Sequence, residues 1–248
     1  RSTHGKRSMP ASALEWGSTF RTGFSGRGKW MSRAQPETAL IAPGKIAGLY
    51  AITSEEPDTE VLARKVRAAL AGGTRILQYR NKSADPGLRR EQATRLHSLC
   101  RAACVPFIIN DDLVLALAID AEGLHLGRDD GDLAIARAKL GAGKLLGASC
   151  YDRMDLAISA RAEGADYVAF GGAFASSTKP GAARAPISLY GEARARLGLP
   201  VVAIGGLTPE NAGTVIDAGA DAVGVISALF NAPDVEAAAR RFSDLFLT

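Results

Sequence analysis

The feature that most constrains this chain is a repeated alternation, starting at Ile46, of short apolar runs with longer segments of helical periodicity. Such alternation is typical of βαβ units, in which a helix connects two parallel strands. We predict strands at 47–52, 75–79, 107–109, 123–125, 145–148, 167–170, 201–204 and 222–225. We predict helices at 58–71, 86–103, 112–120, 131–139, 152–163, 186–197, 208–218 and 233–246.

Three predicted helices end in related sequences, Gly-Gly-Thr at 72–74 and Gly-Ala-Asp at 164–166 and 219–221. Glycine ends a helix readily because it adopts the left-handed conformation without a steric penalty. A short connection that recurs in this way indicates a ring of similar βα units, and the length of 248 residues is near the ~250 of such a barrel. The sequence therefore predicts a (β/α)₈ TIM barrel, with an open doubly wound sheet as the alternative.

Residues at three predicted helix starts can satisfy the free amides there. Asp58, Asp152 and Thr208 have side-chain oxygens suited to an N-cap, and Pro209 suits a first helical turn. We expect these residues to mark the beginnings of their helices.

The distribution of charge separates the first residues from the rest of the chain. The net charge is +4, but residues 1–36 carry seven basic residues and one acid, a net of +6, so the other 212 residues carry −2. This gives no reason to expect nucleic-acid binding by the body of the protein. No apolar run approaches the ~18 residues of a membrane span. Three cysteines make a disulfide framework improbable, so the expected location is the cytoplasm.

We divide the chain into an extension at 1–43 and a barrel domain at 44–248. The extension is rich in serine, glycine and arginine and has no sustained apolar period. We expect it to be disordered or loosely attached. A transit-like segment and a misplaced translation start remain open as explanations of its presence.

Residues that directly follow the strands of a TIM barrel line the mouth where its chemistry takes place. Gln78, Arg80 and Lys82 alternate along the end of the second strand and should share one face. His125, at the end of the fourth strand, is interpreted as an inward-facing residue rather than a general base. The other candidates at strand ends are Asn110, Asp111, Asp130, Ser149, Ser176, Ser177, Thr178, Lys179, Gly205, Gly206, Ile226 and Ser227.

Two anion sites follow from these positions. Gly205-Gly206 and Ile226-Ser227 follow the seventh and eighth strands, where backbone amides commonly bind phosphate. The alternative is that these glycines only form tight turns.

The second site combines cations with carboxylates, because Arg80, Lys82 and Lys179 are expected near Asp111 and Asp130. Carboxylates would repel a diphosphate directly, so we predict a bridging Mg²⁺ held by Asp111 and Asp130. A surface cluster of salt bridges is the alternative.

With these residues in view, the chain resembles the thiamine phosphate synthase family. The resemblance covers residues 46–248. The matching pieces, in the order of the family, are 78–82, 110–111, 125–130, 147–149, 178–180, 203–206 and 224–227.

The resemblance implies a role for each matching residue. The expected pyrimidine diphosphate contacts are Gln78, Tyr79, Arg80, Asn81, Lys82, Asn110, Ser149 and Lys179. The expected thiazole phosphate contacts are Ser176, Ser177, Thr178, Gly206, Ile226 and Ser227. The expected catalytic residues are Arg80, Lys82, Ser149 and Lys179, with Asp111 and Asp130 as ligands of Mg²⁺.

The implied reaction joins 4-amino-5-hydroxymethyl-2-methylpyrimidine diphosphate to a thiazole phosphate, or its carboxylated form, and releases pyrophosphate. Diphosphate leaves first, and the thiazole nitrogen captures the pyrimidine carbocation. The expected partners are these small molecules, without nucleic acid or membrane, and a homo-oligomer remains open. The alternatives are a thiazole phosphate tautomerase of the same fold and a non-catalytic barrel that binds thiazole or thiamine phosphate.

Overall fold

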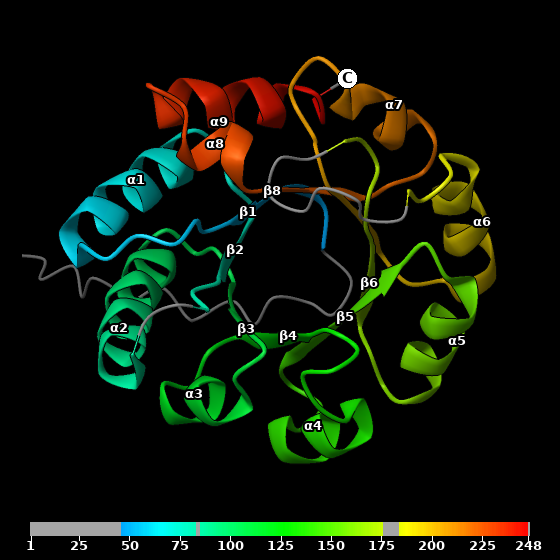
Figure 1. Cartoon of the computed structure of the whole chain (residues 1–248), viewed down its shortest axis with the longest axis horizontal. Helices are drawn as coiled ribbons and strands as arrows, with labels where there is room; N and C mark the ends of the chain where they lie inside the picture. The colour runs from blue at the N-terminus through cyan, green and yellow to red at the C-terminus, as the bar shows by residue number, and fades with distance from the viewer. Residues whose placement is uncertain (1–45, 83–84, 176–183, 248) are drawn as a thin grey trace, which may run out of the picture. The chain divides into compact units, whose positions relative to one another are not determined.

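The computed structural model describes residues 46–82, 85–175 and 184–247. Eight parallel strands form a closed barrel in sequence order, each pairing with its neighbours and β8 with β1 (Figure 1). The strands are β1 Gly48–Ile52, β2 Ile76–Tyr79, β3 Phe107–Asn110, β4 Gly123–Leu126, β5 Leu145–Tyr151, β6 Tyr167–Phe170, β7 Val201–Ile204 and β8 Ala222–Val225. The predicted TIM barrel is confirmed, and closure excludes the open sheet. The predicted extension at 1–43 and the predicted contacts at 176–179 lie outside the described residues.

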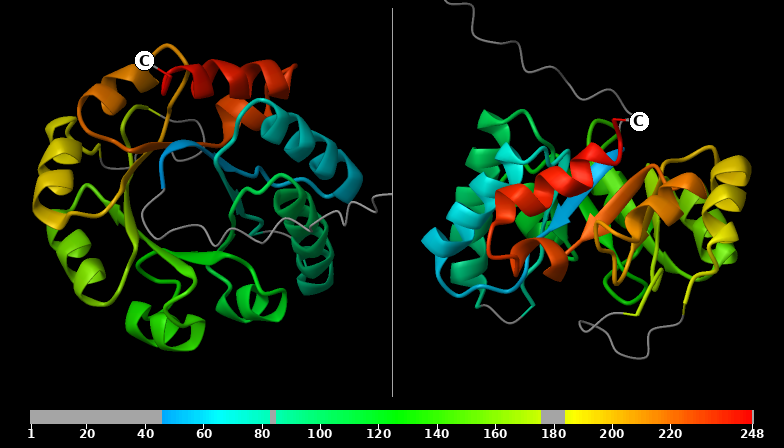
Figure 2. Two further views of the ribbon diagram at one scale, coloured as in Figure 1. Left: turned by 180° about the vertical axis from the view of Figure 1, so that it is seen from behind. Right: turned by 90° about the horizontal axis from the view of Figure 1, so that it is seen from above.

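Helices surround the barrel on its outside, and the side view of Figure 2 shows them flanking the strands. They are α1 Thr59–Ala71, α2 Pro86–Ala102, α3 Leu113–Ala118, α4 Leu133–Leu140, α5 Met154–Ala162, α6 Ser188–Leu197, α7 Ala212–Asp217, α8 Ser227–Phe230 and α9 Val235–Asp244. The short α8 directly follows β8 and was not predicted. Within the described ranges, no helix combines the length and the apolar character needed to cross a membrane.

The predicted helix starts are partly wrong. Asp58 caps α1, accepting hydrogen bonds from the amides of Glu60 and Val61. The residue at the start of α5 is Arg153 rather than Asp152, and it makes no side-chain cap. Thr208 does not cap α7, because the turn 208–211 precedes the helix. The caps that the sequence analysis missed are Asp85, Asp112, Asp132 and Asp234.

The glycine stops have the predicted conformation. Gly73, Gly164 and Gly219 have φ angles of +99°, +94° and +110°. The amide after each glycine closes back onto its helix, as Ala165 N does onto Ala160 O at 2.9 Å and Ala220 N onto Val215 O at 2.9 Å. This is the six-residue closure of a Schellman motif.

The aspartates of the two Gly-Ala-Asp sequences join each new strand to the preceding one. Asp166 N donates to Leu146 O at 2.8 Å, and its Oδ2 accepts from Leu146 N at 2.7 Å. Asp221 makes the same pair of bonds with Val201, at 2.8 and 2.9 Å. The repeated sequence therefore sets the entry of a strand into the barrel.

The hydrophobic core has two parts. The larger part fills the space between strands and helices. The smaller part lies inside the barrel and contains Ile52, Ile76, Ile108, Tyr50 and Tyr167 among its buried residues. Interior packing of this kind leaves the barrel filled rather than open, so ligands can reach only its ends.

Candidate functional site

The end of β2 divides its side chains between two directions, as the alternation predicted. Lys82 reaches the carboxylate of Asp111 at the end of β3, and Arg80 lies 3.4 Å from Glu55 after β1. Tyr79 turns the other way, is 2% exposed and donates to Gln92 of α2 at 2.8 Å. Asn81 donates to the same Gln92 oxygen at 3.2 Å. The side chain of Tyr79 therefore packs under α2, away from the cluster around Lys82.

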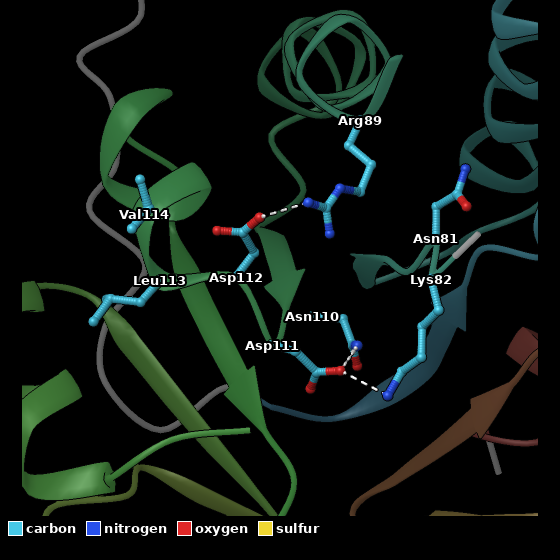
Figure 3. A pocket seen from close by; sticks show the side chains of 8 residues that line it. All are labelled: Asn81, Lys82, Arg89, Asn110, Asp111, Asp112, Leu113 and Val114. Atoms are coloured by element: carbon cyan, nitrogen blue, oxygen red, sulfur yellow. Dashed lines mark hydrogen bonds and ion pairs between the residues drawn. The ribbon is translucent and has the colours of Figure 1, made fainter. Parts of the chain in front are cut away.

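Lys82 brings the two predicted metal ligands into one cluster. Its ammonium lies 3.0 Å from Asp111 Oδ2 and 4.0 Å from Asp130 Oδ1. Figure 3 shows Lys82 and Asn110 both directed at the Asp111 carboxylate, and Asn110 Nδ2 donates to it at 2.6 Å. Burial raises the pKa of Asp111, Lys82 opposes that rise, and the neighbouring carboxylate of Asp130 adds to it.

Local backbone geometry positions both acids. Asp111 has a φ of +64° and its amide donates to His125 O at 2.9 Å, which ties the end of β3 to β4. Positive φ is uncommon for residues other than glycine, although aspartate tolerates it better than most. A Cβ on Gly127 would lie 2.4 Å from Asp130 Oδ2, so this glycine makes room for the carboxylate. The sequence analysis had assigned no role to Gly127.

A cavity of about 450 Å³ opens beside this cluster. It is lined by Asn81, Lys82, Arg89, Asn110, Asp111, Asp112, Leu113 and Val114. Arg89, near the start of α2, was missed by the sequence analysis. It lies 3.7 Å from Asp112 Oδ2, while Asp112 also caps α3. Among the described residues its Nε is buried without a hydrogen-bond partner. Its position in the first turn of the helix that follows β2 is the signal that could have identified it.

A second set of polar side chains lies inside the barrel, and we call it the interior polar chain. It runs from Gln78 through Tyr50, Tyr167 and His125 to Ser149, with successive distances of 2.9, 2.7, 3.2 and 2.8 Å. His125 thus faces inward, as expected, and burial lowers its pKa to about 4. A Cβ on Gly147 would lie 2.1 Å from Tyr167 Cζ and 2.5 Å from His125 Nδ1, so only glycine leaves room for this contact.

The glycines after β7 are required by the backbone. Gly205 and Gly206 have φ angles of +103° and +62°. A Cβ on Gly206 would lie 2.2 Å from Ala175 O, and Phe174 N donates to Gly205 O at 3.0 Å. Tight packing against the segment after β6 therefore explains both glycines, and their phosphate contact stays a prediction.

The residues after β8 begin a short helix. Ile226 is half-buried, packs against the interior core, and accepts hydrogen bonds at its carbonyl from Leu229 and Phe230. Ser227 is the first residue of α8. The structure thus places both residues at the same end of the barrel as the acidic cluster.

Comparison with known proteins decides the family. A family model described as thiamine monophosphate synthase matches residues 49–229. The chain belongs to the thiamine monophosphate synthase family. Membership in the family confirms the resemblance expected from the seven matching pieces.

Named relatives agree with the family. A thiamine-phosphate synthase of Methylobacillus flagellatus is 57% identical over 201 residues, covering 81% of this chain and 96% of the relative. A thiamine-phosphate synthase of Chromobacterium violaceum is 55% identical over 204 residues, covering 82% and 98%. A solved structure of thiamine phosphate pyrophosphorylase from Pyrococcus furiosus is 32% identical, with a TM-score of 0.72, and covers 80% of this chain and 95% of that one. All three names favour the synthase over the tautomerase and the non-catalytic barrel.

Proposed function

We propose that this chain is a thiamine-phosphate synthase, a transferase that joins a pyrimidine diphosphate to a thiazole phosphate with release of pyrophosphate. The observation that carries the proposal is the cluster in which Lys82 contacts both Asp111 and Asp130 at adjacent strand ends. A diphosphate needs fixed cations to compensate its charge as it leaves. It also needs carboxylates that can hold a metal ion against its oxygens.

The donor set fits Mg²⁺. Mg²⁺ usually takes one or two carboxylates and completes its shell with water and substrate phosphate oxygens. We propose Asp111 and Asp130 as its ligands. When bound, the ion would stabilise negative charge on the departing pyrophosphate.

The side chains around the cavity would bind the pyrimidine diphosphate. Lys82 and Arg80 would neutralise phosphate oxygens, and Asn110, next to Asp111, would add a hydrogen bond to them. Asn81 lines the same cavity. Gln78 and Ser149, at the two ends of the interior polar chain, would contact the pyrimidine ring. Lys179 would complete the set of cations from the segment outside the described residues.

The thiazole phosphate would bind across the mouth, near β7 and β8. Gly206, Ile226 and Ser227 are the proposed contacts there, together with Ser176, Ser177 and Thr178. Holding the two substrates face to face would bring the thiazole nitrogen close to the reacting carbon.

The proposed reaction is dissociative. The bond from the pyrimidine methylene carbon to the diphosphate oxygen breaks first, and the electron pair leaves with pyrophosphate. The lone pair of the thiazole nitrogen then forms the new carbon–nitrogen bond. Arg80, Lys82 and Lys179 would stabilise the leaving group, and no protein nucleophile takes part.

The experiment is an assay of the purified protein with both phosphorylated substrates and Mg²⁺. Thiamine phosphate and pyrophosphate should form in equal amounts, and omission of the metal should abolish both. Absence of product, with and without residues 1–43, would count against the function. Asp120→Asn is a matched control for Asp111→Asn. Asp120 follows α3, pairs with Lys144 and lies away from the acidic cluster.

Two further assignments belong to the proposal. Cys100, Cys104 and Cys150 are free thiols, which supports action in a reducing cytoplasm.

The second assignment is the number of copies in the assembly, which light scattering of the purified protein would measure.

A further inference from the structure

The interior polar chain contains three residues to which the proposed function gives no task. Gln78 of β2 and Ser149 of β5 are its ends, and both are proposed to contact the pyrimidine. Tyr50 of β1, Tyr167 of β6 and His125 of β4 lie between them and are buried. Side chains from five different strands thus form one continuous hydrogen-bonded path.

Hydrogen-bond chemistry gives this path a direction. The amide nitrogen of Gln78 can only donate, so the Tyr50 hydroxyl accepts from it. In the described part of the chain the Tyr50 hydroxyl contacts no acceptor besides the Tyr167 hydroxyl, so the proton of Tyr50 goes to the oxygen of Tyr167.

The direction continues through the histidine. Tyr167 accepts from Tyr50 and must donate its own proton to His125 Nδ1. A neutral imidazole that accepts at Nδ1 carries its proton on Nε2, and His125 then donates to Ser149 Oγ. The hydroxyls of Tyr50 and Tyr167 and both ring nitrogens of His125 are satisfied by this single arrangement, as a buried network requires.

Both ends of the path keep one group for a ligand. The Ser149 hydroxyl accepts from His125, and within the described ranges its own proton has no acceptor. Among the described residues, the amide oxygen of Gln78 accepts no hydrogen bond from another side chain. The path therefore presents a donor at Ser149 and an acceptor at Gln78.

We propose that Tyr50, Tyr167 and His125 are positioning residues that set the hydrogen-bond direction of Ser149 and Gln78, and thereby select an aminopyrimidine over an oxopyrimidine. This inference rests on the proposed function for the identity of the ligand. The exocyclic amino group of an aminopyrimidine donates and its ring nitrogen accepts. An oxopyrimidine presents an oxygen where the amino group was and a ring N–H where the acceptor was. An oxopyrimidine would therefore leave the Ser149 hydroxyl and the Gln78 amide oxygen unpaired. A site that binds its ligand through hydrogen bonds strongly rejects a ligand that cannot form them.

The tautomer of His125 tests the direction without any substrate. Nitrogen-15 NMR of histidine-labelled wild-type protein should show the His125 proton on Nε2, with the signal assigned by its loss in His125→Gln. A wild-type protein with the proton mainly on Nδ1 would overturn the proposal.

Reversal of the path is the second test. Gln78→Glu replaces the donor by a carboxylate of the same shape that only accepts. Tyr50 would then donate to residue 78, Tyr167 to Tyr50, and His125 Nδ1 to Tyr167. The proton should move from Nε2 to Nδ1, and an unchanged tautomer in a folded variant with an ionised residue 78 would contradict the direction.

Selectivity is the third test. Tyr50→Phe and Tyr167→Phe each remove one hydroxyl and with it two hydrogen bonds of the path. Each should raise the KM for the pyrimidine diphosphate about tenfold, the effect of losing one well-placed hydrogen bond to the ligand. The preference for the amino over the oxo analogue should fall by a similar factor, while the KM for thiazole phosphate stays unchanged. Tyr79→Phe is the matched control, since it removes a buried hydroxyl from the opposite face of the sheet.

The outcomes separate the two proposals. Two results would overturn the inference, because each would mean that the interior polar chain serves only packing. One is an equal loss of selectivity in Tyr79→Phe and Tyr167→Phe. The other is an equal rise in the KM values for the pyrimidine diphosphate and for thiazole phosphate. Wild-type protein without synthase activity, but with the expected tautomer and its reversal in Gln78→Glu, would refute the proposed function and support the direction of the path.

Discussion

The ammonium of Lys82 lies 3.0 Å from the carboxylate of Asp111, and it comes within 4.0 Å of a second carboxylate, that of Asp130. One cation therefore serves two acids that belong to the ends of neighbouring strands. The local charge of this trio is −1 when all three are ionised, so the cluster favours the arrival of another cation. The first two predictions follow from the charges of the site.

Asp111→Asn should stabilise the protein while it removes activity. Because the pKa of Asp111 is raised, the folded state disfavours its ionised form, and this cost is present above the folded pKa. The cost fades as the pH falls toward the unfolded pKa. We expect the melting temperature of the variant at pH 7 to rise on the order of 2 °C, without such a rise in acid.

Scanning calorimetry measures the change in melting temperature. A second measurement with Mg²⁺ and pyrophosphate added compares how far these ligands stabilise the wild type and the variant. The pair should raise the melting temperature of the wild type through binding to the folded state, and should leave that of Asp111→Asn unchanged. Equal ligand shifts in both proteins would refute the assignment of Asp111 as a metal ligand.

His125 should make the protein sensitive to mild acid. Burial lowers its pKa from 6.5 to about 4, so between these values the unfolded chain binds a proton that the folded protein does not. Stability is then complete above 6.5 and is lost as the pH falls through this window, by at most about 3 kcal/mol. Urea unfolding at a series of pH values measures the loss. His125→Gln should flatten this part of the profile, and a flat wild-type profile would contradict the prediction.

Gly206→Ala should harm the site through the backbone. Its Cβ would lie 2.2 Å from Ala175 O, in addition to the strain of a φ of +62°. Gly198→Ala is a matched control, because Gly198 has a φ of +61° but nothing within 4 Å of the added Cβ. Strain alone should cost Gly198→Ala about 1 kcal/mol. Chemical unfolding should show a larger loss for Gly206→Ala, and kinetics should show a raised KM for thiazole phosphate. Equal losses of stability in Gly206→Ala and Gly198→Ala would mean that the segment around Ala175 moves to accommodate the added Cβ without cost.

Asp221→Ala should destabilise the barrel at the entry of β7. The carboxylate accepts from Val201 N at 2.9 Å and pairs with Arg194 at 3.3 Å, so its removal leaves a buried strand amide without its side-chain acceptor. We expect a loss of about 2 kcal/mol in the free energy of unfolding. Asp217→Ala, at the exposed end of α7, should cost much less, because an acid at a helix C-terminus opposes the helix dipole. Urea denaturation of both variants measures the difference.

Much of the fold could be predicted because its signals are local. Each βα unit carries its own apolar period and its own glycine stop, and a residue such as Gly164 needs only its neighbours to end a helix. The alternation of Gln78, Arg80 and Lys82 was equally local, since successive side chains of any strand point to opposite faces. The helix starts were less accurate, since the caps Asp85 and Asp132 were missed.

The partners of the site residues depended on the tertiary structure. Nothing in the sequence pairs Tyr50 with Tyr167, which lie 117 positions apart, or places Ser149 beside His125. Those contacts arise from the stagger of strands around a closed barrel, which a linear pattern does not contain. The same reason explains Arg89, to which the sequence analysis gave no role.

The order of strands and helices, the face of each strand and the set of polar strand ends were thus determined by the sequence itself, because each depends on a few adjacent residues. Which of those ends meet, and which way their hydrogen bonds run, was decided by the closure of the barrel. Closure brings distant strands within hydrogen-bond distance, and burial then requires every polar atom among them to find a partner.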